Sequence, residues 1–233
     1  MTESFQKLNR SAALKGTILF LLVLFLITIS SPFLMKVLGV TKINGTVLLI
    51  SRLLFWACAG LAWWYSIKLD NQNLLIWPEK KYSFLFYLVS FIAILLVIVI
   101  GMFCIQLIIS LSGLIKKSTV YDALTGIFKT NIPLLIFTCL TAGVTEELIF
   151  RGFLLPRLEI IFKNPWAAII VSSLLFGLMH AKYGTIINIA GPVFIGFVFA
   201  YYYWKYRNIK ILMLFHFLWD LSLLLIAVKA SMP

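Results

Sequence analysis

The residues of this sequence that could do chemistry lie inside its most apolar stretches. Glu146 and Glu147 are adjacent in one apolar run, and the two histidines of the chain, His180 and His216, lie in two later runs. Asp220 follows His216 by four residues. A charged side chain in the middle of a membrane helix costs about 2.5–3.5 kcal/mol on insertion scales. These residues therefore require either a partner or a function.

The spacing of the acidic residues gives the two glutamates different tasks. Adjacent side chains of a helix point about 100° apart, so Glu146 and Glu147 cannot face the same group. Glu147 and Arg151 are four residues apart, which predicts an ion pair on one helix face. This pair would leave Glu146 free to face a cavity. The alternative interpretation is that both carboxylates only hold helices together through polar contacts.

Each histidine shares a helix face with a second residue. Phe176 precedes His180 by four residues, and Asp220 follows His216 by four. A carboxylate at this spacing can orient an imidazole and fix its tautomer, or it can supply a metal ligand. Phe176 is one of twenty phenylalanines, so we interpret it as a packing residue that supports the site.

A carboxylate, two imidazoles and a second carboxylate on three helices are typical of a hydrolytic site. A glutamate in a low-dielectric cavity can act as general base toward water. His180, His216 and either Glu146 or Asp220 would also provide the ligands of a zinc ion with an open position for water. The common HExxH zinc motif is absent. The residues thus leave open whether the site works without a cofactor or with a divalent metal such as zinc.

The composition assigns the whole chain to the membrane. Its 233 residues are 62% hydrophobic and only 12% charged, with a mean hydropathy of +1.04. Soluble domains carry about 45–50% apolar and about 25% charged residues. The net charge of +12 then indicates lysine-rich cytoplasmic loops and attraction to anionic lipid, and not nucleic-acid binding. The three cysteines lie in apolar runs without CxxC spacing, which argues against disulfides and against a cysteine metal site.

Hydropathy and length predict an all-α, polytopic helix bundle of about seven spans with a polar intramembrane cavity, since a span needs about 20 mostly apolar residues. The first apolar run is long enough to span and has no convincing cleavage site, so we interpret it as a retained helix and not as a signal peptide. The third run is overlong and should tilt. The predicted spans cover 17–35, 44–67, 83–114, 132–153, 165–181, 184–203 and 210–228.

The lysines and arginines between these spans predict the orientation. Eleven fall on the side of the N-terminus and seven on the other side, which places the N-terminus in the cytoplasm. No internal repeat or low-complexity linker divides the chain. We expect one membrane domain, with N-terminal helices in 1–130 and a catalytic helical core in 131–228.

Three motifs resemble those of a known family, the CAAX prenyl protease and bacteriocin-processing family of intramembrane proteases, also called CPBP or Abi proteins. Glu146 to Arg151 fits EExxxR, Phe176 to His180 fits FxxxH, and His216 to Asp220 fits Hxxx followed by Asn or Asp. The motifs occur in the family's order on separate spans, and the resemblance covers roughly residues 130–228. The first three predicted spans lie outside this range, and only their hydropathy agrees with a membrane protein of this kind.

The resemblance implies a helical membrane fold with a cavity open to the cytosol and an endopeptidase activity. It implies that Glu146 activates water with help from His180 and His216, as a glutamic protease or with a metal. Relatives often have Asn at the position of Asp220. An ionised aspartate cannot donate to an oxyanion, which favours a role in orienting His216 or in binding metal. Bacterial members of the family are linked to peptide maturation, bacteriocin self-immunity or surface-protein regulation.

We therefore expect a multi-pass protein of the cell membrane that cleaves peptide or membrane-protein substrates near the cytoplasmic face. One alternative is a non-catalytic immunity or scaffold protein that binds a membrane-active peptide or partner. Another is a proton-coupled transporter, although inverted repeats are not seen. The expected depths of the site residues in the membrane disagree. Glu146 and His216 lie about 10 Å from the expected cytoplasmic face, whereas His180 lies about 22 Å from it if its helix begins at Pro165.

Overall fold

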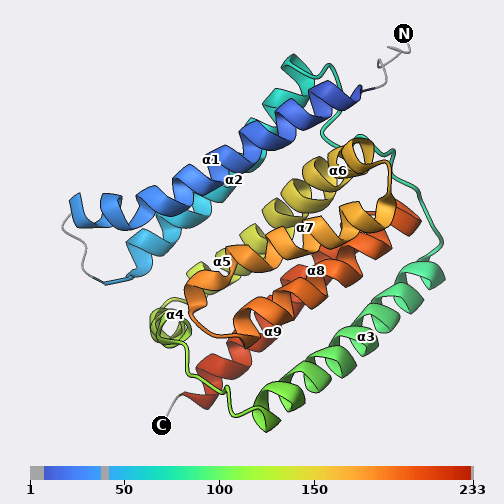
Figure 1. Ribbon diagram of the computed structural model, residues 1–233. Coiled ribbons are helices and arrows are strands. Elements are labelled where there is room, and N and C mark those ends of the chain that lie inside the picture. Colours follow the sequence, from blue (N-terminus) through green and yellow to red (C-terminus); the bar gives the residue numbers. More distant parts are fainter. Residues whose placement is uncertain (1–7, 38–41, 232–233) are drawn as a thin grey trace.

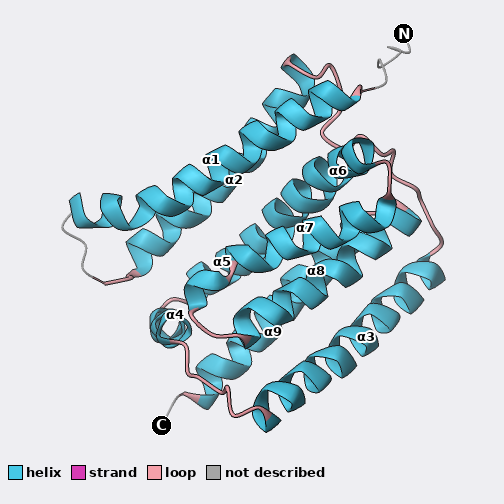
Figure 2. Cartoon of the chain, viewed as in Figure 1, coloured by secondary structure: helices cyan, strands magenta, loops and turns pink. Residues whose placement is uncertain are grey.

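The computed structural model describes residues 8–37 and 42–231, and every regular element within these ranges is a helix (Figures 1 and 2). The all-α prediction is confirmed. In chain order the elements are α1 (Arg10–Val37), α2 (Gly45–Lys68), α3 (Phe84–Leu111), α4 (Thr119–Thr130), α5 (Ile132–Thr141), the π-helical η1 (Ala142–Glu146) and η2 (Leu148–Leu154), α6 (Leu155–Phe162), α7 (Pro165–Met179), the 3-10 turn η3 (Ala181–Tyr183), α8 (Ile187–Tyr206) and α9 (Lys210–Ala230).

Among the described residues, six helices are long and apolar enough to cross a membrane. They are Gly45–Lys68, Phe84–Leu111, Ile132–Phe162, Pro165–Tyr183, Ile187–Tyr206 and Lys210–Ala230. These six match the last six predicted spans, which confirms a multi-pass membrane protein. The first predicted span, 17–35, falls within α1, but the side chains from residue 27 onward lie outside the described residues.

The predicted fourth span ends too early. The helix that begins at Ile132 continues to Phe162. Arg157, which the predicted bounds place in a loop between two spans, is instead buried within this helix. Its guanidinium contacts Asp70 Oδ2 at 2.6 Å and Ser66 Oγ at 3.1 Å, and it lies over the ring of Phe153 at 3.7 Å. This buried ion pair compensates the charge and fixes the end of α2 against α6.

The short helix α4 is also missing from the predicted spans. Twelve residues are too few to cross a bilayer, and α4 instead lies across the ends of the neighbouring helices (Figure 1). Ser118 caps its first turn by accepting from the backbone N–H of Tyr121 at 3.2 Å, and Ser118 Oγ donates to Tyr183 O at 2.7 Å. We call this side of the bundle the α4 end, and the side that carries the start of α1 the N-terminal end.

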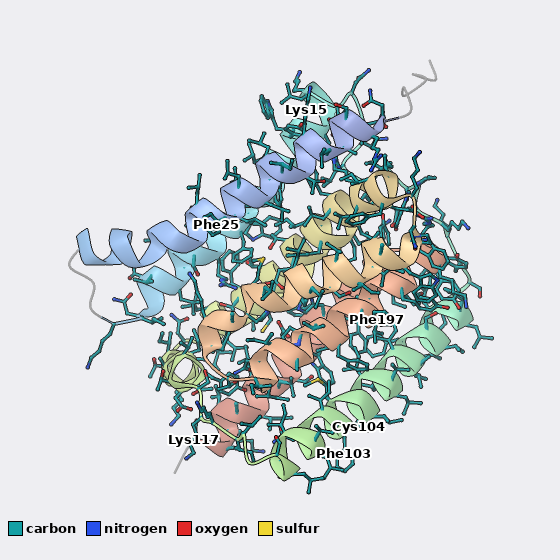
Figure 3. All side chains as sticks on the ribbon, in the orientation of Figure 1. Lys15, Phe25, Phe103, Cys104, Lys117 and Phe197 are labelled. Atoms are coloured by element: carbon teal, nitrogen blue, oxygen red, sulfur yellow. The ribbon has the colours of Figure 1, made fainter. Side chains whose placement is uncertain are left out.

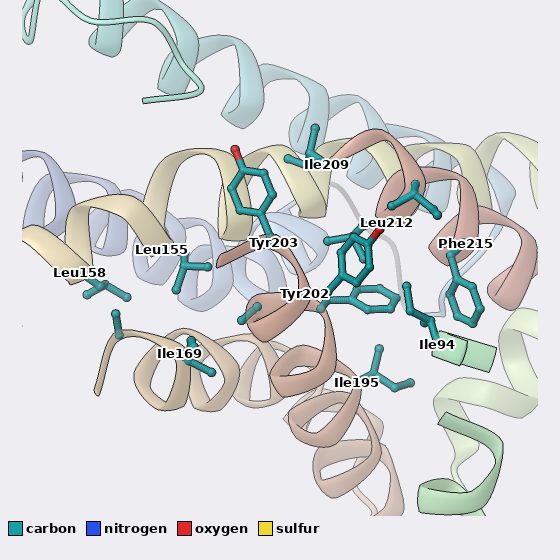
Figure 4. Packing of buried hydrophobic residues seen from close by; sticks show 14 of the residues in the cluster. Ile94, Leu155, Leu158, Ile169, Ile195, Tyr202, Tyr203, Ile209, Leu212 and Phe215 are labelled. Atoms are coloured by element: carbon teal, nitrogen blue, oxygen red, sulfur yellow. The ribbon is translucent and has the colours of Figure 1, made fainter. Parts of the chain in front are cut away.

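The described residues form three buried apolar clusters, while other apolar side chains of the bundle are exposed. Tyr203, Leu212 and Phe215 pack together where α8 and α9 meet the rest of the core (Figure 4). On the outer helix α3, Phe103 is 68% exposed, as expected of a surface that faces lipid tails (Figure 3). Apolar burial alone therefore does not define the interior, and polar contacts have to fix the helix positions.

One glycine sets the distance between α9 and the π-helical region. A Cβ atom added at Gly143 would lie 2.8 Å from the backbone atoms Met213 O and Phe217 N. Those atoms belong to α9 and cannot swing away as a flexible side chain could. Gly143 thus permits the close approach that brings α9 against η1.

We predict that Gly143→Ala lowers the stability of the bundle. Alanine is ordinarily better than glycine inside a helix by about 0.5–1 kcal/mol, but the clash with α9 should outweigh this gain by overpacking of about 1–3 kcal/mol. Gly60→Ala is the matched control, because a Cβ at Gly60 in α2 meets nothing within 4 Å. Thermal unfolding in detergent should show a lower midpoint for Gly143→Ala alone. Equal midpoints for the two variants would contradict the close approach.

Candidate active site

The candidate site is built on the irregular part of the long helix Ile132–Phe162. Its middle is π-helical over Ala142–Glu146 and Leu148–Leu154, which brackets both glutamates. Single π-turns within helices occur frequently at functional sites, because the wider turn redirects the side chains that follow. Glu146 and Glu147 are both buried here, at 6% and 0% exposure.

Glu147 is the anchor of the cluster. Its Oε1 accepts a hydrogen bond from Arg151 Nη1 at 3.0 Å, so the structure contains the ion pair predicted from the spacing. The same oxygen lies 2.9 Å from His216 Nδ1 on α9. The second contact was not predicted, because sequence spacing gives no information about which residues meet between helices.

Arg151 is held from three further directions. Its Nη2 donates to the carbonyl oxygen of Gly196 on α8 at 3.2 Å. Its guanidinium lies over the ring of Phe176 at 4.5 Å and near that of Phe199 at 5.3 Å. The planar cation is thus stacked and hydrogen-bonded without access to water, which lowers the cost of burying it.

Phe176 lies at the centre of the site and is 2% exposed. Its ring centroid is 5.2 Å from that of His180 and 6.1 Å from that of His216. The residue therefore packs, as the sequence suggested, but it packs between the two histidines and beneath Arg151. Its side chain fixes the spacing between three of the motif residues.

The imidazole of His180 has a defined tautomer. His180 follows the last turn of α7, and its Nδ1 lies 3.0 Å from the carbonyl oxygen of Phe176. A carbonyl can only accept, so Nδ1 carries the proton, and Nε2 accepts from a bound group in the neutral ring and donates only when the ring is protonated. The half-buried ring also stacks on Tyr183, with centroids 6.1 Å apart.

The orienting partner predicted for His216 is different in the structure. Asp220 Oδ2 lies 3.5 Å from His216 Nε2, beyond the usual length of a hydrogen bond, whereas Glu147 contacts Nδ1 at 2.9 Å. The side chain of Asp220 is 31% exposed. It also lies close to Tyr121 of α4, where burial raises the pKa of the phenol and the Asp220 carboxylate raises it further.

Glu146 is the motif carboxylate without a partner among the described residues. Its Oε2 is buried, and no described group donates a hydrogen bond to it. Within the same ranges, no hydrogen bond or ion pair joins Glu146 to His180 or His216, and the contacts of Glu147 and Phe176 connect these elements. The structure therefore brings the three motifs together while leaving one carboxylate uncommitted.

The arrangement does not fit a metal site. In the described parts of the chain, no three His, Cys, Asp or Glu side chains are grouped so that they could hold a metal ion. The predicted ligand set of His180, His216 and a carboxylate is thus not grouped around one point in these parts of the chain.

A cavity of about 540 Å³ lies away from these residues. It opens between the first turns of α2 and α5, and its lining includes Asn44, Leu49, Asn131, Leu134 and Phe137. Neither glutamate nor histidine of the motifs lines it. The polar cavity predicted at Glu146 remains a prediction.

Comparison with known proteins identifies the family. The family model described as type II CAAX prenyl endopeptidase, Rce1-like, matches residues 128–222. This part of the chain is therefore similar to that family. A search of curated proteins finds no match to the chain, and a search of solved structures finds none.

The match to the Rce1-like family confirms the resemblance seen in the three motifs. The matched residues run from the end of α4 into α9 and include all seven candidate residues, from Glu146 to Asp220. At the level of the family, this region is a CAAX-protease-like membrane endopeptidase. The helices α1, α2 and α3 lie outside the match.

The contacts of Glu147 generate a testable prediction about stability. Arg151→Ala leaves Glu147 with His216, whereas Glu147→Ala leaves both Arg151 and His216 without their carboxylate. Removing one partner of a buried pair costs about 3–5 kcal/mol. We therefore expect both variants to unfold at lower temperature in detergent, with the larger loss for Glu147→Ala.

A double-mutant cycle tests whether the losses of stability at Glu147 and Arg151 are coupled or independent. The double variant of Glu147 and Arg151 should be more stable than the sum of the single losses predicts, since neither charge is then left alone. Additive losses would show that the pair contributes no coupling. A smaller loss for Glu147→Ala than for Arg151→Ala would contradict its contact with His216.

Proposed function

We propose that the chain is an intramembrane endopeptidase in which Glu146 is the general base. The observation that supports this proposal most strongly is the uncommitted, buried carboxylate of Glu146 beside a cluster that fixes both motif histidines. Glu147 is engaged by Arg151 and His216, so it serves as a positioning residue. The two adjacent glutamates thereby take the different tasks that their spacing predicts.

The proposed reaction is direct hydrolysis of a peptide bond. Glu146 removes a proton from water, and the resulting hydroxide attacks the carbonyl carbon to form a tetrahedral oxyanion. His180 and His216 stabilise that charge from Nε2, which donates a hydrogen bond when the ring is protonated, since Nδ1 of each ring is already held by an acceptor. The C–N bond then breaks, and the proton held by Glu146 passes to the leaving nitrogen. The products are a new carboxylate and a new amine.

In this scheme Glu147 orients His216 through Nδ1, and the carboxylate of Asp220, 3.5 Å from Nε2, favours the protonated form of the ring. An ionised aspartate has no proton to donate, so it cannot stabilise the oxyanion itself. Phe176 and Arg151 keep the histidines and Glu147 in place. We assign the region 131–228 as the catalytic core, with the helices of 1–130 packed around it, and peptide or membrane-protein substrates as its partners.

The substrate reaches the site from the α4 end in this proposal. The 15 residues of α7 rise about 22 Å, less than the roughly 30 Å of hydrocarbon, so His180 lies below the surface and beneath α4. This arrangement separates two expectations. If the N-terminus is cytoplasmic, as the lysine and arginine count predicts, then the α4 end faces away from the cytoplasm. Cleavage at the cytoplasmic face requires the opposite orientation.

The role of Glu146 is tested by Glu146→Gln in the full-length protein. Glutamine is close in shape but cannot take a proton from water, so we expect proteolysis to fall by at least about 100-fold, the lower range for loss of a general base. Cleavage of an internally quenched, S-farnesylated CAAX peptide in liposomes would measure it. Asp122→Asn, an exposed acidic residue of α4, is the control.

Full cleavage by a well-folded Glu146→Gln protein would contradict the general-base role. Persistence of a biological function such as immunity in this variant, with no cleavage by either protein, would favour the alternative of a non-catalytic binding scaffold. The thermal midpoints of both variants should match that of the unaltered protein, which excludes misfolding as the cause.

Chelation tests the choice between a glutamic and a metal-dependent mechanism. Because the motif residues are not grouped as a metal site, we expect cleavage to continue after treatment with strong chelators. Elemental analysis of the detergent-purified protein is the independent measurement. Loss of cleavage that added zinc restores, together with zinc that disappears in His180→Ala, would overturn this assignment.

A further inference from the structure

The roles assigned so far give the oxyanion no neutral hydrogen-bond donor. Nδ1 of His180 and Nδ1 of His216 are both held by acceptors, so each ring donates only from Nε2 and only when it is protonated. The ionised carboxylate of Asp220 cannot donate at all. A donor that keeps its proton at neutral pH and is fixed in place beforehand stabilises an oxyanion effectively. A hydroxyl or amide beside these residues would supply such a donor.

Tyr183 is the last residue of the 3-10 turn η3, three residues after His180. Residues three apart are eclipsed in a 3-10 helix, and the two rings are accordingly stacked, with an angle of 18° between their planes. Ser118 Oγ at the start of α4 donates to Tyr183 O at 2.7 Å, and Tyr183 N donates to His180 O at 3.1 Å. The backbone of Tyr183 is thus held on both sides, and its ring lies in a fixed relation to the imidazole.

The half-buried ring of Tyr183 faces the interior of the bundle. It packs against the buried apolar cluster that side chains of α2, α4, α5 and α9 form. Phe217 and Leu221 pack against the same cluster, and they directly follow His216 and Asp220 on α9. The side chain of Tyr183 is therefore on the side of η3 that carries the motif residues, and not on the side that faces lipid.

The phenol oxygen of Tyr183 lies near the charged groups of the site. It interacts electrostatically with Glu146 of η1, with Asp220 of α9 and with Arg52 of α2. Such interactions weaken with distance, so charged side chains from three helices lie close to this hydroxyl. Among the described residues, no group forms a hydrogen bond with it. Tyr183 therefore places an uncommitted donor beside the proposed general base.

We propose that the hydroxyl of Tyr183 donates a hydrogen bond to the tetrahedral oxyanion, an inference that rests on the proposed endopeptidase function. A phenol keeps its proton at neutral pH and donates where an ionised carboxylate cannot. Hydroxide, formed when Glu146 takes a proton from water, attacks the carbonyl carbon, and the carbonyl oxygen gains the negative charge. Tyr183 meets this charge without giving up its proton, so the balance of the hydrolysis is unchanged. Tyr183 is then a catalytic residue outside the three motifs.

Tyr183→Phe tests this role, because it keeps the ring that stacks on His180 and removes only the hydroxyl. Loss of one oxyanion donor lowers kcat by about 100-fold or more. We expect this fall in kcat with KM nearly unchanged, since the contact forms only as the carbonyl is attacked. The measurement uses the internally quenched, S-farnesylated CAAX peptide and the full-length protein in liposomes. Tyr201→Phe is the matched control, because Tyr201 of α8 also stacks at 18°, on Trp166, away from the motif residues.

A phosphinate peptide measures the same contact without cleavage. It has –PO₂⁻–CH₂– in place of the amide that follows the S-farnesyl cysteine, so its charged oxygens resemble the oxyanion. Tyr183→Phe should weaken its binding at least about tenfold, as expected for a charged hydrogen bond. The amide peptide, measured in the Glu146→Gln background to prevent cleavage, should bind equally with and without Tyr183→Phe. Equal weakening for both peptides would make Tyr183 a packing residue and overturn the inference.

The two measurements distinguish failure of this inference from failure of the proposed function. Full kcat in Tyr183→Phe would overturn the role of Tyr183 and leave the endopeptidase in place. A fall in kcat that accompanies a lower thermal midpoint and unchanged phosphinate binding would also overturn it. Absence of cleavage by the unaltered protein would refute the endopeptidase. Phosphinate binding that Tyr183→Phe weakens selectively would then still assign the hydroxyl as an anion donor of this site.

Discussion

The carboxylate of Glu147 is the contact on which the rest of the site depends. One of its oxygens holds Arg151 on its own helix at 3.0 Å and His216 on α9 at 2.9 Å. In a low-dielectric interior, such a charge is tolerated only when hydrogen-bonded partners surround it. The need to satisfy Glu147 thus draws α9 to the long helix and orients His216. Glu146, at the neighbouring position of the same irregular helix, has a buried Oε2 without a described donor, and we propose it as the general base.

The packing around Glu147 permits α9 to lie close to the helix that carries it. Gly143 lets the backbone of α9 approach η1, and a side chain there would clash with Met213 O and Phe217 N. Phe176 fills the space between Arg151 and the two histidines. The Arg157–Asp70 pair holds the end of α2 on the far side of the same helix, and Trp56 fixes the face of α2 that carries Arg52. Polar and small residues set these positions, since apolar side chains have no preference between lipid and protein.

Sequence reasoning could predict the features that repeat along one helix. Hydropathy gave the last six spans, and the four-residue spacing of Glu147 and Arg151 gave their ion pair. It could not predict contacts between helices, so it assigned His216 to Asp220 alone and placed Arg157 in a loop. It also missed α4, which is amphipathic and too short for a span, although Ser118 before it is a recognisable N-cap.

The central claim is that water, activated by Glu146, attacks the peptide bond directly. A single turnover in water enriched in ¹⁸O, followed by mass spectrometry of product and protein, tests it most directly. The account predicts one ¹⁸O in the new C-terminal carboxylate of the product and none in the protein peptide that contains Glu146. Label in the side chain of Glu146 would show that this residue attacks as a nucleophile, and it would contradict the account.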